Sequence, residues 1–277
     1  LGSMGLLEIN SKSVAIANDR RNIATIVDAS GFSMPITSQV SRPRTHQLPP
    51  QLTRAGLFCG LVAPLLWAAA IVLAGELRPG FDHVRQYISE LGERGSSTET
   101  FMRFGGFVAS GFLIVGYAAA FHVTVARVTD RPRLTLLVAV LVALNGIGRI
   151  GAGIFPCEPG CATPEVFSQR LHGLSATIAF LAIAAAALLG TLLFRRNIRL
   201  RPLGAYSFAS GCAGLIFLAL MSASEATHVH TGLFERLASG VLTLWLFVTA
   251  WGLLRREIPI SQRKTRLPRS TGKSGQI

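Results

Sequence analysis

The feature that most constrains this chain is a series of six apolar runs, each roughly 18 to 24 residues long, the length that crosses a hydrocarbon core of about 30 Å as a helix. They cover residues 55–74, 101–123, 134–155, 171–194, 203–221 and 233–254. Half of all residues are hydrophobic, 15% are charged, and the mean hydropathy is +0.46. The sequence therefore predicts an all-α integral membrane bundle of six transmembrane helices.

The loops between the runs alternate in charge. Loops 124–133 and 195–202 are rich in Arg, whereas loops 75–100, 156–170 and 222–232 carry more acidic than basic residues. Because Lys and Arg concentrate in cytoplasmic loops, the three non-basic loops are predicted to face outward. We expect a multi-pass protein of the inner (plasma) membrane with both termini in the cytoplasm.

Two basic tails flank the membrane domain, which is predicted at residues 54–254. Residues 1–53 include a piece rich in Pro, Ser and Thr, which predicts a disordered cytoplasmic tail. Residues 255–277 predict a second cytoplasmic tail that is attracted to lipid headgroups. The chain does not begin with Met, and Met4 or Met34 is a candidate start.

The formal net charge of +13 does not indicate nucleic-acid binding. The basic residues lie in short stretches between apolar runs, and no folded basic domain is evident. Membrane lipids are the expected partners, no nucleic acid is expected, and a homo-oligomer is possible.

The most polar stretch between the apolar runs is Phe81–Gly92, with the sequence FDHVRQYISELG. At about 100° per residue, a helix here would gather its apolar side chains on one arc. These side chains are Phe81, Val84, Tyr87, Ile88 and Leu91. We therefore expect a short amphipathic interfacial helix in the first outer loop, with its polar arc toward a ligand.

Arg149 is the most unusual residue within a run, because it lies about six residues inside the outer end of the third run. A charge at this depth normally faces the bundle interior and has a partner, which Glu90, Asp82 or Glu225 could supply. Alternatively, Arg149 extends toward the surface and Asn145 makes an interhelical hydrogen bond.

Polar residues from three outer loops and the span ends predict a ligand-binding site on the outer face. Its expected members are Asp82, Ser89, Glu90, Arg149, His172 and Glu225.

The same residues leave a catalytic site open, with Ser89, Glu90 and His172 as candidates. No Gly-x-Ser-x-Gly motif surrounds Ser89, and the alternative is a hydroxyl on a helix surface. No catalytic role is assigned.

A zinc site is also possible, although no cofactor is assigned. His172, His228 and His230 could bind zinc together with Glu225 or Asp82 and leave a water to be activated. The spacing is not diagnostic, because a His-x-His pair on a loop is more often a surface feature.

The four cysteines fall into two groups. Cys157 and Cys161 bracket Glu-Pro-Gly in an outer loop, on the oxidising side of the membrane, which favours a disulfide. Thiolate metal ligation is the alternative. Cys59 and Cys212 lie within apolar runs and are expected to be packing residues.

The motifs YISELG, GIFPCEPGC and LHGLSA occur in this order along the chain. Over roughly residues 56–254 the chain resembles a bacterial and archaeal six-span membrane family known only as domain of unknown function 998. The resemblance implies the six-span architecture, carries no activity, and draws attention to Ser89, Glu90, Gly92, Phe155, Pro156, Cys157 and His172. The chain is more distantly similar to the Frag1/DRAM/Sfk1 group, whose roles concern lipid and membrane regulation.

Three functions are compatible with the sequence. The first is an outward-facing polar pocket for a lipid headgroup or small amphipathic ligand, in a sensing, lipid-handling or accessory role. The second is a metal-dependent membrane hydrolase, although the last run lacks the His residues found in hydrolases similar to alkaline ceramidases. The third is a small secondary transporter, although no inverted repeat is evident.

Overall fold

The computed structural model divides the chain into two compact units, residues 1–47 and 48–277. The residues it describes are 14–18, 23–27, 33–36, 49–162, 165–196, 198, 200–227 and 229–264, with side chains from residue 49 to residue 256. Most of the two predicted tails lies outside these ranges.

The first unit contains a three-stranded antiparallel sheet in the order β1-β2-β3. Its strands are β1 (Val14–Asn18), β2 (Ile23–Val27) and β3 (Ser33–Ile36). Val14 pairs with Val27, and Ala24 pairs with Ile36. Val and Ile are frequent in β1 and β2, and these residues favour extended backbone. The sheet differs from the sequence prediction, which placed no regular structure here.

Six helices in the described part of the second unit are long and apolar enough to cross a membrane. They are α1 (Pro50–Leu77), the joined η2 (Phe101–Val108) and α2 (Ala109–Ala126), α3 (Pro132–Ile154), α4 (Phe167–Phe194), α5 (Arg201–Ser224) and α6 (Thr231–Lys264). Each contains one predicted apolar run to within one residue. The predicted six-helix membrane architecture is therefore confirmed.

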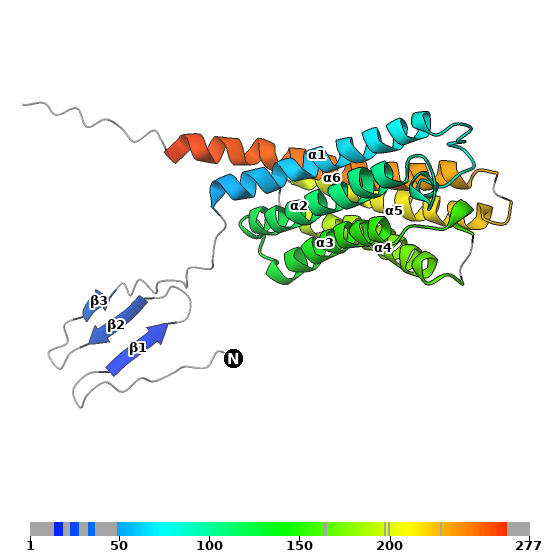
Figure 1. Ribbon diagram of the computed structural model, residues 1–277. Helices are drawn as coiled ribbons and strands as arrows, with labels where there is room; N and C mark the ends of the chain where they lie inside the picture. Colours follow the sequence, from blue (N-terminus) through cyan, green and yellow to red (C-terminus); the bar gives the residue numbers. More distant parts are fainter. Residues whose placement is uncertain are drawn as a thin grey trace, which may run out of the picture. The chain divides into compact units, whose positions relative to one another are not determined.

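The six helices form a closed bundle. Each helix packs on the next along the chain, and α6 packs back against α1. The start of α1 and the end of α6 lie at one end of the bundle (Figure 1). The loops 78–100 and 155–162 lie at the opposite end, which we call the outer end because the charge pattern predicts that these loops face outward. The cytoplasmic position of both termini stays a prediction.

A close contact between α3 and α4 helps to shape the outer half of the bundle. A side chain at Gly148 would lie 2.6 Å from the backbone oxygen of Ser175 and 2.9 Å from Cβ of Ala179, so only glycine permits this approach. Asn145 Nδ2 then donates to the backbone oxygen of Ala179 at 2.9 Å. This is the interhelical hydrogen bond that the sequence offered as an alternative for Asn145.

Two apolar clusters fill the bundle. The larger contains the buried rings of Tyr117, Phe121, Phe194 and Trp245. The smaller contains Trp67, Met102 and Phe107 from the helices together with Ile88 and Leu91 from the 78–100 loop. The outer loop therefore contributes apolar side chains to the protein interior and does not merely connect two spans.

Candidate functional site

The segment Phe81–Gly92 does not form the continuous amphipathic helix that the sequence predicted. It consists of turns followed by a short 3₁₀ helix, η1, at Ser89–Gly92. Asp82 explains the first turn, because its Oδ1 accepts the backbone N–H of Val84 at 2.8 Å. An Asp side chain bonded to the backbone two residues on favours a turn over a helix.

Two further carboxylates hold the second half of this segment. Glu90 accepts the backbone N–H of Tyr87 at 2.9 Å through Oε1 and Nε2 of Gln86 at 2.7 Å through Oε2. Glu235 of α6 accepts the backbone N–H of Ile88 at 2.5 Å. Carboxylates thus take the place of the backbone carbonyls that a helix would supply, and they attach the loop to α6.

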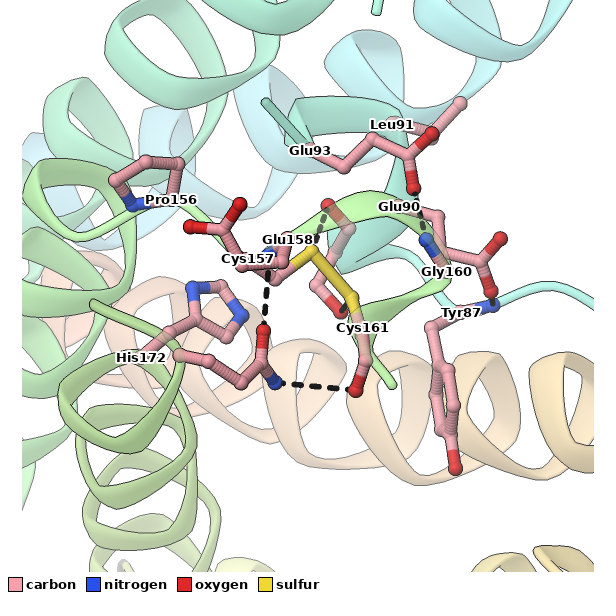
Figure 2. The surroundings of a disulfide bond; sticks show 12 residues. Tyr87, Glu90, Leu91, Glu93, Pro156, Cys157, Glu158, Gly160, Cys161 and His172 are labelled. Carbon is pink, nitrogen blue, oxygen red and sulfur yellow. Dashed lines mark hydrogen bonds between the residues drawn. A yellow bond between two sulfur atoms is a disulfide. The ribbon is translucent and has the colours of Figure 1, made fainter. Parts of the chain in front are cut away.

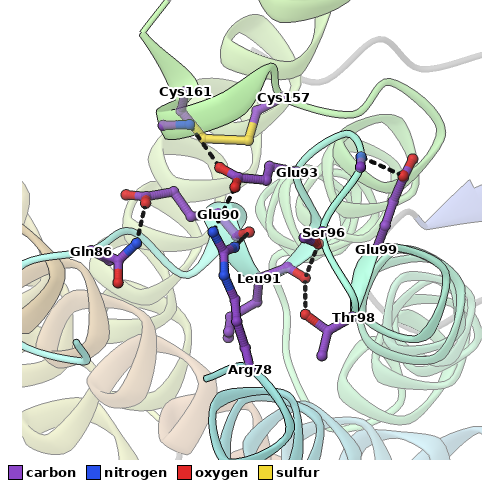
Figure 3. A network of polar contacts seen from close by, with 12 residues as sticks. Arg78, Gln86, Glu90, Leu91, Glu93, Ser96, Thr98, Glu99, Cys157 and Cys161 are labelled. Carbon is purple, nitrogen blue, oxygen red and sulfur yellow. Dashed lines mark hydrogen bonds and ion pairs between the residues drawn. A yellow bond between two sulfur atoms is a disulfide. The ribbon is translucent and has the colours of Figure 1, made fainter. Parts of the chain in front are cut away.

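Residues 87–93 and the loop 157–161 pack together at the outer end, and we call these two segments the outer cap. Glu93 joins them, because its Oε2 accepts the backbone N–H of Gly160 at 2.7 Å. Its Oε1 pairs with Arg78 at 2.5 Å (Figure 3). The buried Glu93 carboxylate is therefore bonded through both oxygens, and charge-assisted bonds hold the cap in place.

A disulfide joins Cys157 and Cys161, the pairing that the sequence favoured. Ser89 lies against it, with Oγ 3.4 Å from Cys161 Sγ. The backbone N–H of Arg94 donates to the oxygen of Cys157 at 2.9 Å. Figure 2 shows the disulfide between the end of α3 and the 87–93 segment, with His172 close by. Ser89 is thus a contact of the disulfide loop.

His172 and Arg103 complete the outer end of α3. The last carbonyl groups of a helix have no partner within it. Here His172 Nδ1 lies 3.0 Å from the backbone oxygen of Ala152 and 2.8 Å from that of Phe155. Arg103 donates to the backbone oxygens of Gly153 and Ile154 at 2.9 Å each. Because both partners of Nδ1 are acceptors, Nδ1 carries the proton.

Beneath the outer cap lies a cavity of about 40 Å³, which we call the central cavity. Its polar lining consists of Ser89, Asn145, Arg149, His172, Glu235, Ser239 and Thr243. The cavity therefore brings together Ser89, Arg149 and His172, three residues of the predicted ligand site. Asp82, Glu90 and Glu225 do not line it.

Arg149 is only 8% exposed and has no acidic partner in the described part of the chain. Its Nη2 donates to Thr243 Oγ1 at 2.9 Å, and its guanidinium lies 4.3 Å from the ring centre of Trp67. Its Nη1 is buried and has no hydrogen-bond partner among the residues that the structure describes. The prediction that Arg149 faces the bundle interior is confirmed.

The acidic partners predicted for Arg149 are engaged elsewhere. Asp82 pairs with Arg85 at 3.8 Å on the surface. Glu225 is exposed and accepts a hydrogen bond from Tyr87; burial raises the pKa of this phenol, and the charge of Glu225 raises it further. Glu90 is bonded to Tyr87 and Gln86 within the outer loop, as described above. The prediction of an acidic partner for Arg149 was therefore wrong.

A second hollow, of about 660 Å³, lies between α1 and α6, and we call it the lateral groove. Its walls are mainly apolar and include Leu65, Ile71, Val72, Leu237, Leu244 and Phe247. Trp67, Ser239 and Thr243 line both the lateral groove and the central cavity. Trp67 Nε1 donates to Ser239 Oγ at 2.9 Å, and these two residues form a wall with Thr243 between the two spaces.

Arg236 lies at the outer end of the lateral groove. Its Nη1 donates to the backbone oxygens of Gln86 at 2.7 Å and Gly232 at 2.9 Å, and its Nε donates to His83 Nδ1 at 3.2 Å. Burial lowers the pKa of His83, and the positive charge of Arg236 lowers it further. Nη2 of Arg236 is buried and has no partner among the described residues.

The predicted zinc ligands are only partly described. His228 lies outside the described residues. His172 lines the central cavity, whereas His230 is exposed and its ring packs on Phe234. Across the residues that the structure describes, no group of three or more His, Cys, Asp or Glu side chains could hold a metal ion.

Sequence reasoning grouped Glu235 and Arg236 with the polar residues at the span ends but did not include them in the predicted ligand site, and it did not consider Arg103. The first two are adjacent charges near the start of an apolar run, which is a signal for a functional residue inside a membrane span. Arg103 carries the same signal, because it lies near the start of the run 101–123, but its role depends on the end of α3, about 50 residues away.

The model of one protein family, described as protein of unknown function (DUF998), matches residues 61–252. The chain therefore belongs to this family, in agreement with the resemblance noted in its sequence. No curated protein and no solved structure matches the chain.

Proposed function

We propose that this member of the DUF998 family binds a single anionic amphipathic lipid in the lateral groove. The acyl chain lies between α1 and α6, and the anionic group contacts Arg236 at the outer end. This role belongs to the lipid-handling and sensing class of functions, with the binding site between two helices and not at the polar residues of the outer loops.

The observation that carries the proposal is the free nitrogen of Arg236. Three of the hydrogen bonds of this guanidinium are fixed by Gln86, Gly232 and His83, so its orientation is set before any ligand arrives. Nη2 is left as a buried donor without a partner in the described part of the chain. A guanidinium with a free N–H suits a phosphate or carboxylate oxygen.

The groove suits the apolar part of such a ligand. Leu65, Val72 and Leu244 on its walls are 61%, 57% and 53% exposed. Within a membrane span such side chains face lipid, so an acyl chain can enter sideways from the bilayer. The central cavity is far too small for this purpose, at about 40 Å³ against about 660 Å³ for the groove.

The test uses the full chain, purified in detergent and examined by native mass spectrometry after incubation with phosphatidylglycerol, phosphatidylcholine or oleate. We expect phosphatidylglycerol or oleate to be retained in preference to phosphatidylcholine, and the stronger of the two identifies phosphate or carboxylate as the bound group. Arg236→Gln is expected to abolish the preference. The control Arg85→Gln, at an exposed position in the first outer loop, is expected to keep it.

A second pair of variants tests the groove itself. No atom lies within 4 Å of the position that a side chain would take at Gly240, which lines the groove. Gly240→Leu therefore adds a side chain to the groove from a position with free space around its Cβ, and it is expected to reduce lipid retention at least about tenfold. Gly173→Leu is the matched control, because Gly173 is equally unhindered and lies outside the groove. Equal retention of all three lipids, or undiminished retention by Gly240→Leu, contradicts the proposal.

A further inference from the structure

The central cavity is lined by a buried positive charge, the guanidinium of Arg149. Arg149 lies inside a membrane span, is 92% buried and forms no ion pair within the described part of the chain. A buried guanidinium without a countercharge is strongly unfavourable. Stacking on Trp67 and one hydrogen bond to Thr243 compensate only part of this cost.

Glu235 does not supply the missing charge. It lines the same cavity, but Oε2 is bonded to the backbone N–H of Ile88 at 2.5 Å, and no salt bridge joins the carboxylate to Arg149. The charged groups beside Glu235 are Arg236, its neighbour in sequence, and Glu90 of the outer loop. Arg149 is therefore the cation of the cavity, and its Nη1 is the free donor.

We infer that the central cavity binds a small monovalent inorganic anion of the halide class at Nη1 of Arg149. The size of the cavity limits the ligand. A volume of about 40 Å³ has room for roughly two or three water-sized molecules, so a halide with one water fits and a lipid phosphate with its ester groups does not.

The other polar groups of the cavity complete the site. Ser239 accepts a hydrogen bond from Trp67, and Thr243 accepts one from Arg149, each through the hydroxyl oxygen. Each hydroxyl retains its own hydrogen, which is available to donate to an anion. The buried Oδ1 of Asn145 has no partner within the described ranges and suits the accompanying water.

The test measures thermal unfolding of the full chain in detergent, in sodium chloride or bromide and in sodium gluconate of equal ionic strength. A halide that binds only the folded protein raises the melting temperature, whereas the bulky gluconate does not fit. Arg149→Gln is expected to remove the difference between the salts. Thr243→Val, which removes one hydroxyl donor at nearly constant shape, is expected to weaken halide binding about ten- to a hundredfold.

Two further experiments separate halide binding from lipid binding and from a folding defect of the variant. Arg236→Gln, which abolishes lipid preference in the proposed function, is expected to keep the halide effect, so the two proposals fail independently. If Arg149→Gln does not fold, a bromide soak of wild-type crystals is expected to show anomalous scattering beside Nη1. The inference is overturned by equal melting temperatures in all salts with no bromide at Arg149, or by a halide effect that persists in Arg149→Gln.

Discussion

The lateral groove and the central cavity share a wall but differ in size and in access. Each has an Arg with one buried nitrogen that lacks a partner among the described residues, Arg236 in the groove and Arg149 in the cavity. The groove is large and open toward lipid, whereas the cavity is small and lies beneath the outer cap. The same chemical group therefore indicates a lipid headgroup in one place and a small ion in the other, because the surrounding space decides which anion can approach.

The largest effect is expected from removing Trp67, which forms part of the wall between the groove and the cavity. Trp67 is 5% exposed, stacks on Arg149 and bonds to Ser239. Trp67→Ala is expected to lower the free energy of unfolding by about 3–5 kcal/mol. It also joins the two spaces, so phosphatidylglycerol is expected to compete with bromide in the variant and not in the wild type. Denaturant unfolding and the salt-dependent melting temperature measure the two effects.

Trp251→Ala is the control for this prediction. Trp251 is 44% exposed on α6 and lines neither space, so its removal is expected to cost much less and to leave lipid and halide binding separate. Competition between lipid and bromide in the wild type, at the level seen in Trp67→Ala, would mean that the wall does not separate the two spaces.

Opening the outer cap is expected to have the next largest effect. Cys157 and Cys161 close a loop with a sequence separation of 4, and the loss of so short a crosslink costs about 2 kcal/mol of unfolding free energy. The double variant Cys157→Ser/Cys161→Ser should therefore melt at a lower temperature than the wild type. Reductant should lower the wild-type melting temperature and leave the double variant unchanged. Because the cap covers the cavity and not the groove, lipid retention should not change; a parallel loss of lipid would show that the cap also shapes the groove.

Much of the fold could be predicted from the sequence because span length and loop charge are local properties. The failures share a different physical origin. The segment Phe81–Gly92 has a helical pattern, yet the backbone N–H of Ile88 is bonded to Glu235, 147 residues away. The environment of Arg149 likewise depends on Trp67 and Thr243, from two other helices. Contacts between distant segments contributed to both cases, and a single sequence carries no signal of them, whereas the turn at Asp82 is a local signal that the helical pattern outweighed.

A smaller effect is expected from removing the negative charge of Glu235. Glu235→Gln keeps an oxygen that can accept the N–H of Ile88, so the outer loop should keep its position. The variant removes a carboxyl group that lines the central cavity, and halide affinity is expected to rise about threefold to tenfold. The half-maximal bromide concentration for thermal stabilisation measures this change. Unchanged or weaker bromide binding would indicate that Glu235 is already neutral or that it orders the site.

The smallest expected effect is a pH dependence that belongs to the groove. Burial and the charge of Arg236 lower the pKa of His83, whereas the charges of Glu76 and Asp82 act in the opposite direction. In the unfolded chain His83 titrates near its ordinary value of about 6.5. The unfolded state therefore binds the proton more readily, so the stabilising contribution of neutral His83 is complete above about pH 6.5 and is lost as the pH falls through the lowered pKa of the folded protein.

Because protonated His83 cannot accept the hydrogen bond from Nε of Arg236, acidification also releases the arginine that holds the lipid headgroup. Between about pH 7.5 and pH 5.5, the melting temperature of the wild type should fall more than that of His83→Gln, whereas His230→Gln, at an exposed position, should follow the wild type. If the melting temperatures of the wild type and His83→Gln fall equally with pH, protonation of His83 does not affect Arg236. The free nitrogen of Arg236 would then be the sole basis for headgroup binding.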